Sequence, residues 1–346
     1  MKKITGRFLG VLLGTALAFG TAAVAAESET APDEAGGAGN PSVEAADPAG
    51  SEETAAAVRV GALKGPTSMG LVNLMEEAGD EYEFTMVTAA DELLPMVIGG
   101  DLDIALLPAN VAAILYQKTE GGIAVIDINT LGVLYLVSGN EEIQEITDLA
   151  GRTVYLTGKG TTPDFVLQYL LTQNGLDMEQ VTLEYKSEPT EVAAVLAQDP
   201  QAIGLLPQPF ATVACAQNEA LGVVMDLTEE WDKAQSSGDG SRLVTGVTVA
   251  RREFLEESPE AVSAFLEGHA ASAEAINDDP KAGAELVVKA GIIEKAPIAE
   301  KAIPFCSITC ITGEEMREAL SGYLQVLYDQ DPASVGGALP EEDFYF

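Results

Sequence analysis

Short apolar segments alternate with amphipathic ones along most of the chain. Between residues 58 and 226 each apolar run precedes a stretch whose apolar positions recur at helical spacing, and this order favours βαβ units and a mostly parallel sheet. The pattern predicts an α/β fold. The predicted strands are Val58–Leu63, Tyr82–Val87, Ile104–Leu107, Ile123–Asn129, Leu131–Ser138, Val154–Thr157, Val181–Tyr185, Ala202–Leu206, Val223–Asp226 and Gly246–Ala250.

Helices follow most of these strands and dominate the last hundred residues. Beyond Asp226 the helices are amphipathic and carry no obvious chemistry; one of them begins after Ser258-Pro259, a cap residue followed by proline. The predicted helices are Thr67–Ala78, Ala90–Ile98, Ala109–Gln117, Pro163–Gln173, Glu191–Gln198, Pro209–Gln217, Glu260–Asn277, Lys281–Ala290, Ile298–Ala302 and Glu314–Asp329.

Two segments of the chain resemble each other closely. Residues 99–108 and 198–207 each contain a helix end, a polar turn, a short apolar strand and a proline. A duplicated lobe is the simplest explanation. The folded part, residues 58–346, is also large enough to form two lobes.

Two glycine turns carry the candidate chemistry. The first runs through Lys64 to Met69 after an apolar strand, and the second contains Lys159 to Thr162 after another. Such turns present backbone N–H groups to a ligand at a helix N-terminus. The chain has only 18 Lys and Arg, so a lysine in each turn suggests an anionic ligand between two walls of one cleft. The alternative is that both lysines are solvated loop residues.

The other candidates lie at strand ends or on a strand that joins the lobes. Hydroxyl residues in the turns either cap helices or contact ligand, and both roles are compatible. Asn110 and Gln208 offer amides near strand ends, while Tyr135 could stack on a ring or simply pack in the core. The complete set of candidate ligand-binding residues is Lys64, Gly65, Pro66, Thr67, Ser68, Met69, Pro108, Asn110, Tyr135, Lys159, Gly160, Thr161, Thr162 and Gln208.

The N-terminal region is predicted to be an export signal and a tether. Residues 1–26 combine a basic start, an apolar stretch and a small-residue cleavage site, and the stretch is shorter than the roughly 20 apolar residues of a membrane span. Residues 27–57 are acidic and lack aromatics, so we expect a disordered linker. We then expect the protein to be periplasmic, freely secreted into the extracellular medium, or held at the cell surface by an uncleaved N-terminus.

Charge and cysteine content exclude several classes. The net charge of −37 comes without any Lys/Arg cluster, which argues against binding nucleic acid or an anionic membrane. Cys306 and Cys310 would lie about 13 Å apart on an extended strand, too far for a disulfide unless the chain bends. The only histidine, His269, is distant in sequence from both, and the spacing fits no common zinc site. No catalytic or metal-ligating residue is predicted, and no cofactor.

Four segments carry a resemblance to a known family. They are residues 61–70, residues 103–110, the Asp148-Leu149-Ala150-Gly151-Arg152-Thr153-Val154 stretch, and Val335-Gly336-Gly337 with Leu339-Pro340. From residue 58 onward the chain resembles the substrate-binding subunits of ABC importers, in the branch that binds nitrate, sulfonates or taurine, and thiamine pyrimidine precursors. The resemblance does not specify the ligand.

The resemblance implies a two-lobed, periplasmic-binding-protein-like (type II) fold. Each lobe would hold a mixed, mostly parallel sheet flanked by helices, with lobe 1 at 58–138 plus 226–346 and lobe 2 at 139–225, joined by crossover strands near 137–140 and 225–228. A monomer would capture a small polar ligand, anionic or heteroaromatic, and deliver it to a permease without catalysis. A sensor or scavenger, or an enzyme related to pyrimidine-precursor synthases, are the alternatives.

Overall fold

The computed structural model describes residues 56–235 and 241–346. The predicted signal peptide, and the predicted linker except for its last two residues, lie outside this part of the chain. Within the described residues, no helix combines the length and the apolar character needed to cross a membrane.

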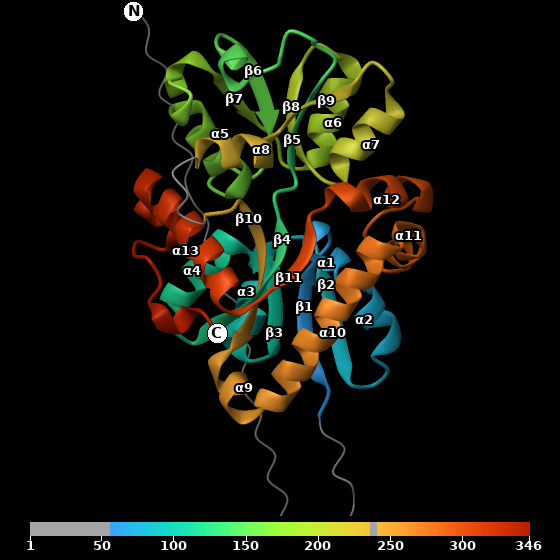
Figure 1. The fold of residues 1–346 in the computed structure, drawn as a ribbon, viewed down its shortest axis with the longest axis vertical. Coiled ribbons are helices and arrows are strands. Elements are labelled where there is room, and N and C mark those ends of the chain that lie inside the picture. Colours follow the sequence, from blue (N-terminus) through green and yellow to red (C-terminus); the bar gives the residue numbers. More distant parts are fainter. Residues whose placement is uncertain (1–55, 236–240) are drawn as a thin grey trace, which may run out of the picture. The chain divides into compact units, whose positions relative to one another are not determined.

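The first sheet has six strands in the order β11-β4-β10-β3-β1-β2 (Figure 1). Strands β1, β2 and β3 are parallel, whereas β10 runs antiparallel to both β3 and β4. The carboxyl ends of β1, β3 and β4 therefore lie at one edge. The bounds are β1 Val58–Leu63, β2 Tyr82–Val87, β3 Ile104–Pro108, β4 Ile123–Leu131, β10 Val244–Arg251 and β11 Ile308–Ile311.

The second sheet has five strands in the order β7-β6-β8-β5-β9. Strands β6, β7 and β8 are parallel, and β5 runs antiparallel between β8 and β9. Each sheet thus mixes parallel and antiparallel strands, so the predicted two-lobed α/β fold is confirmed. The bounds are β5 Leu134–Ser138, β6 Thr153–Leu156, β7 Thr182–Tyr185, β8 Ile203–Pro207 and β9 Gly222–Asp226.

The helices follow the predicted order, with three differences. The predicted helix over residues 67–78 is two short helices separated at Gly70 and Leu71, and helices α8 and α9 were not predicted. Among the strands, β11 was not predicted. The bounds are α1 Pro66–Met69, α2 Val72–Glu77, α3 Ala90–Gly99, α4 Ala109–Lys118, α5 Thr162–Gln173, α6 Pro189–Gln198, α7 Phe210–Gln217, α8 Leu227–Ala234, α9 Arg252–Glu257, α10 Pro259–Asp278, α11 Pro280–Lys289, α12 Ala296–Ala302 and α13 Gly313–Gln330, with 3₁₀ turns η1 Ile146–Leu149, η2 Met178–Gln180, η3 Ile303–Phe305, η4 Pro332–Val335 and η5 Glu342–Phe344.

The chain changes sheets earlier than predicted. Strand β5 pairs with β8 and β9, so it belongs to the second sheet and not to the first lobe. The change occurs at Gly132 and Val133, whose φ angles are 47° and 71°. A β-branched residue at positive φ is unusual, so the apolar run gave no warning of this bend. The second change follows α8, which packs on α5, β5 and β9, and so lies beyond the predicted 225–228.

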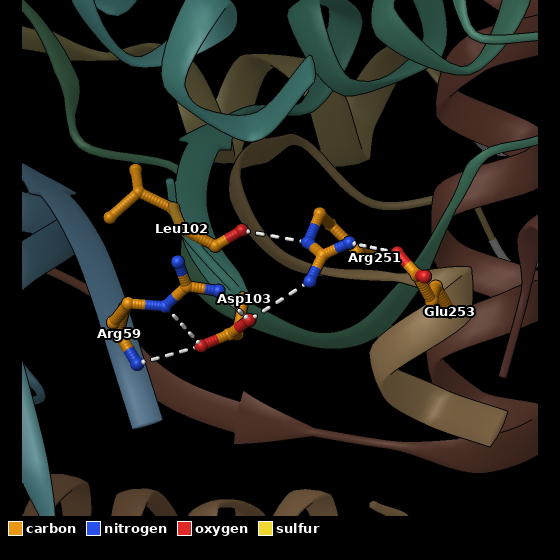
Figure 2. A network of polar contacts seen from close by, with 5 residues as sticks. All are labelled: Arg59, Leu102, Asp103, Arg251 and Glu253. Carbon is orange, nitrogen blue, oxygen red and sulfur yellow. Dashed lines mark hydrogen bonds and ion pairs between the residues drawn. The ribbon is translucent and has the colours of Figure 1, made fainter. Parts of the chain in front are cut away.

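A polar network ties three strands together at the far edge of the first sheet (Figure 2). The Asp103 carboxylate accepts hydrogen bonds from the backbone N–H of Arg59 at 3.0 Å and from its Nε at 2.9 Å. Arg251 donates to the same carboxylate at 3.1 Å and to the carbonyl oxygen of Leu102 at 3.0 Å. Because Arg59 lies near the start of β1 and Arg251 ends β10, the network lies at the end of the sheet opposite to the carboxyl ends of β1 and β3.

Candidate functional site

In the first glycine turn, the buried residues that were predicted to bind ligand make contacts within the protein instead. Ser68 is fully buried, and its hydroxyl donates to the carbonyl oxygen of Leu63 within the same turn. Met69 is also fully buried and packs in an apolar cluster with α10, α11 and α12. Lys64 is exposed, and Gly65 occupies the N-cap position of α1, so no side chain caps this helix. These contacts explain Ser68 and Met69 without a ligand.

Thr67 packs close to the buried side-chain amide of Asn129, near the carboxyl end of β4 in the first sheet. Gly246 on β10 lies so close to Thr67 and to the Oδ1 atom of Asn129 that a Cβ at this position would collide with both. Asn129 is 1% exposed, and its Oδ1 has no hydrogen-bond partner among the described residues. Its Nδ2 donates to Thr248 Oγ1 at 3.2 Å. Thr67 and Asn129 thus pack closely on Gly246, and sequence reasoning did not single out the buried amide of Asn129.

The polar chain continues to the histidine. Thr248 donates to Asp127 Oδ1 at 2.8 Å, and Asp127 Oδ2 lies 3.1 Å from His269 Nδ1. Asp127 and His269 are both fully buried, and Cys310 completes a cluster whose ligand atoms lie within 4.8 Å of one another. His269 and Cys310 are distant in sequence, but packing of α10 on β11 brings these two residues together.

The amide of Asn110 points away from the second lobe. Pro108 ends β3 and caps α4, and Asn110 Nδ2 lies 3.4 Å from the carbonyl oxygen of Ser334 in η4. Its Oδ1 has no partner among the residues that the structure describes. Asn110 is 1% exposed, so its main contact is the packing of α4 on η4.

The second glycine turn is already neutralised by a carboxylate of its own helix. Asp164, which is 3% exposed, accepts from the Gly160 N–H at 2.8 Å and from the Tyr185 hydroxyl at 2.7 Å. Lys159 lies over the Tyr185 ring at 5.3 Å, and Thr161 donates its hydroxyl to Gly158 at 2.6 Å. An anion at this helix N-terminus would compete with Asp164, so the turn offers little for a negative ligand.

Thr162 lies against the first lobe. It is buried beside Tyr323 of α13, whose phenol pKa is raised by burial. Neither hydroxyl has a partner in hydrogen-bonding geometry among the described residues. Trp231 of α8 packs 5.5 Å from the Tyr323 ring. This side of the lobe contact is filled by aromatic side chains.

Tyr135 and Gln208 line a cavity of about 630 Å³ between the second sheet and α12. Tyr135 pairs with Asp226 at the end of β9, and Gln208 follows the end of β8, so all three lie at one sheet edge. Ligands of open α/β sheets bind at such carboxyl ends. The lining residues are Tyr135, Gln208, Thr212, Cys215, Ala216, Gly222, Val223, Asp226, Lys301 and Phe305.

The cavity wall is mostly apolar, with a few polar atoms available. Gln208 Oε1 accepts from Thr212 Oγ1 at 2.9 Å, and Gln208 Nε2 has no partner among the described residues. Lys301 forms no ion pair within the described part of the chain. Phe305 is 54% exposed and Val223 49% exposed. The cavity thus offers an apolar surface, an amide donor and an ammonium group.

Burial keeps the phenol and the thiol of the cavity uncharged, while Asp226 contributes a carboxylate to the cavity wall. Burial, and then the Asp226 charge, raise the pKa of the Tyr135 phenol well above its usual value. Tyr135 accordingly donates to the carbonyl oxygen of Phe305 at 3.0 Å. Burial also raises the pKa of the Cys215 thiol, which disfavours the reactive thiolate.

A larger groove of about 1130 Å³ runs between α5 and α13. Its walls include the C-terminal turns of both helices and no strand end. Gln168, Gln173, Gln325 and Gln330 contribute amides to it, and no lysine or arginine lines it. The cavity at the strand ends therefore remains the candidate ligand site, and only two of the fourteen predicted residues line it.

Comparisons with known proteins agree with this architecture. Residues 121–283 match the family model described as NMT1/THI5 like. No curated protein sequence matches the chain. The predicted resemblance to substrate-binding proteins of ABC importers is confirmed by this domain together with the solved structures below.

Three solved structures illustrate the range of sequence identity and of structural similarity among the matches. An ABC transporter from Parabacteroides distasonis is 25% identical, with a TM-score of 0.72 over 84% of this chain and 99% of that one. The periplasmic aliphatic sulphonate binding protein SsuA from Escherichia coli is 18% identical, with a TM-score of 0.66 over 85% and 92%. The desulfurization enzyme DSZB is 14% identical, with a TM-score of 0.56 over 83% and 97%.

Proposed function

Starting from a chain that has the fold of ABC-importer substrate-binding proteins and an NMT1/THI5-like domain, we propose that it captures a small organic anion and delivers it to a permease. The observation that carries this proposal is the cavity of about 630 Å³, which is lined from both lobes. Its walls come from the end of the second sheet and from α12 with η3. A ligand there would bridge the lobes, as capture between two lobes requires.

The wall chemistry favours an apolar body with an anionic head. Phe305 and Val223 provide apolar contacts, while Lys301 and the Gln208 amide provide donors to an anion. Charge-assisted donors of this kind bind oxyanions more strongly than neutral ones. An aliphatic sulfonate, which the Escherichia coli SsuA binds by its description, has this chemistry. Bare nitrate lacks the apolar body.

Capture would involve motion of the lobes about the connections after β4 and after α8. On this proposal lobe 1 comprises 58–133 and 244–346, and lobe 2 comprises 134–234. Opening breaks the hydrogen bond from Tyr135 to Phe305, which is one neutral bond worth about 1 kcal/mol. This bond by itself contributes little to keeping the lobes closed. Delivery to a permease places the protein outside the cytoplasmic membrane, as for the periplasmic relative.

The enzyme DSZB raises a second candidate, catalysis in the same cavity. The cavity offers no nucleophile paired with a base. His269 is fully buried in the first lobe and does not line it, and the raised pKa of Cys215 keeps that thiol protonated. Nucleophilic catalysis by cysteine needs an adjacent base or a lowered pKa. The geometry therefore favours binding over reaction.

Calorimetric titration of the purified protein tests the proposal. The probes are ethanesulfonate, taurine, nitrate and pyrimidine, and each solution is afterwards examined by mass spectrometry. We expect ethanesulfonate or taurine to bind and to be recovered unchanged, with a smaller radius of gyration in X-ray scattering. Failure of all the probes to bind, or release of sulfite from a sulfonate, contradicts the proposed role.

A further inference from the structure

A buried cluster in the first lobe brings together three metal-ligating side chains from distant parts of the sequence. Asp127 lies on β4, His269 on α10 and Cys310 on β11. One ligand atom from each lies within 4.8 Å of the other two, and the first two residues are fully buried. None of the three lines the candidate ligand cavity. The cluster thus needs an explanation of its own.

Without a cation, the polar atoms of the cluster have few partners among the described residues, and His269 Nε2 has none. The one ionic partner that the described residues offer to the Asp127 carboxylate is His269. The hydrogen bond from the Cys310 thiol to the Leu266 carbonyl oxygen is long, at 4.0 Å. Two groups that are anionic when they ligate metal are thus held together in a buried place, where unpaired charge is costly.

We propose that Asp127, His269 and Cys310 bind a divalent zinc-class cation. A mixed O, N and S donor set suits Zn²⁺ better than Ca²⁺ or Mg²⁺, which prefer oxygen alone. The 3.1 Å between Asp127 Oδ2 and His269 Nδ1 is close to the edge of a tetrahedral zinc site, about 3.3 Å. Binding releases the Cys310 thiol proton to solvent, and the imidazole proton moves to Nε2.

Neighbouring hydrogen bonds already orient one of the proposed ligands, the Asp127 carboxylate. Thr248 donates to Asp127 Oδ1 at 2.8 Å, which leaves Oδ2 directed at the histidine. Asn129 in turn donates to Thr248 at 3.2 Å. Hydrogen bonds to the ligating carboxylate are the usual second layer of a zinc site. Cys310 is partly exposed, which gives the ion a route in and leaves a fourth position for water.

The proposed ion would fasten three elements beneath α1. His269 Nε2 faces Gly70, directly after α1, at a distance that leaves no room for a larger residue. An ion held by β4, α10 and β11 would fix α10 against the sheet next to the first glycine turn. The role is structural and does not depend on what the lobes capture.

The test measures zinc bound by the purified protein after dialysis against a chelator. We expect one equivalent of Zn²⁺ in chelator-buffered titrations and an increase in Tm. Co²⁺ should add a thiolate charge-transfer band in the near ultraviolet. Cys310→Ser should abolish this band and weaken zinc binding at least about tenfold, while Cys215→Ser and Cys306→Ser leave both unchanged.

Asp127→Asn serves as the second variant, because it keeps an acceptor for Thr248 while removing the charge. It should also weaken zinc binding at least about tenfold, with circular dichroism showing the wild-type fold. The inference is overturned if the wild type takes up no zinc under these conditions. It is equally overturned if Cys310→Ser and Asp127→Asn bind the ion as the wild type does, because zinc is then held elsewhere, for example by exposed carboxylates.

Discussion

The Tyr135 hydroxyl donates a hydrogen bond of 3.0 Å to the Phe305 carbonyl oxygen, joining the second sheet to the turn after α12. Tyr135 is 5% exposed, whereas Phe305 is 54% exposed. The bond thus crosses from a buried residue of one lobe to a surface residue of the other. It borders the cavity in which we place the ligand.

Tyr135→Phe removes this bond and keeps the ring. We expect the ligand-free protein to lose about 1 kcal/mol of stability, the usual contribution of a neutral hydrogen bond. Its radius of gyration in X-ray scattering should increase. Tyr155→Phe is the control, because the Tyr155 hydroxyl makes no hydrogen bond within the described residues. Equal scattering curves for Tyr135→Phe and the wild type would show that the bond does not hold the lobes together.

Lys301→Gln removes the cation at the cavity wall. The affinity for ethanesulfonate should fall about tenfold, because a charge-assisted hydrogen bond is replaced by a neutral one. Lys295→Gln changes the same residue type at an exposed position that does not line the cavity. Calorimetry that finds the same loss in both variants would point to general electrostatics and not to contact with the ligand.

Asp103→Asn tests the network of Figure 2 through its pH dependence. Burial alone would raise the pKa of Asp103, but hydrogen bonds from Arg59 and Arg251 outweigh it and hold the pKa below its usual value. A lowered pKa in the folded state contributes stability above the unfolded pKa, near 4. That contribution is lost as the pH falls through the folded value.

The variant should therefore be less stable by about 2 kcal/mol at pH 7, and the difference should shrink below about pH 4. Urea unfolding at pH 7 and pH 3 measures both values. The control is Asp101→Asn, an exposed carboxylate two residues away. A deficit that stays constant between the two pH values would mean that the loss has another origin.

Gly246→Ala tests the close packing around Asn129. The new Cβ would collide with the Asn129 amide oxygen and with Thr67, so we expect a loss of about 1–3 kcal/mol from overpacking. Gly222→Ala is the matched control, since a Cβ there meets no atom within 4 Å. Thermal unfolding of the two variants should separate them clearly, and equal melting temperatures would refute the close approach.

The order of strands and helices could be predicted because the apolar pattern is local. The bend at Gly132 and Val133 could not, since nothing in an apolar run distinguishes a strand that continues from one that changes sheets. Helix α8 was not predicted because most of its residues are polar or acidic, so the buried Trp231 did not stand out as part of an apolar helix face.

The site was harder to predict than the fold. Tyr135 and Gln208 could be found because they lie next to recognisable strand ends. Lys301 and Phe305 lie in a helical region whose sequence contains no ligand-binding motif. Only the tertiary fold places them opposite β9. The hydroxyls of Ser68 and Thr161 matched a ligand-binding pattern, yet each donates within its own turn. A turn motif alone cannot separate these two roles.

The location of the ligand is the central claim, and a crystal structure of the protein with ethanesulfonate tests it most directly. We predict the sulfonate between Gln208 Nε2 and Lys301 Nζ, with its ethyl group against Phe305. Ethanesulfonate bound instead at the glycine turn of Gly158 and Gly160, or in the groove between α5 and α13, would contradict the account.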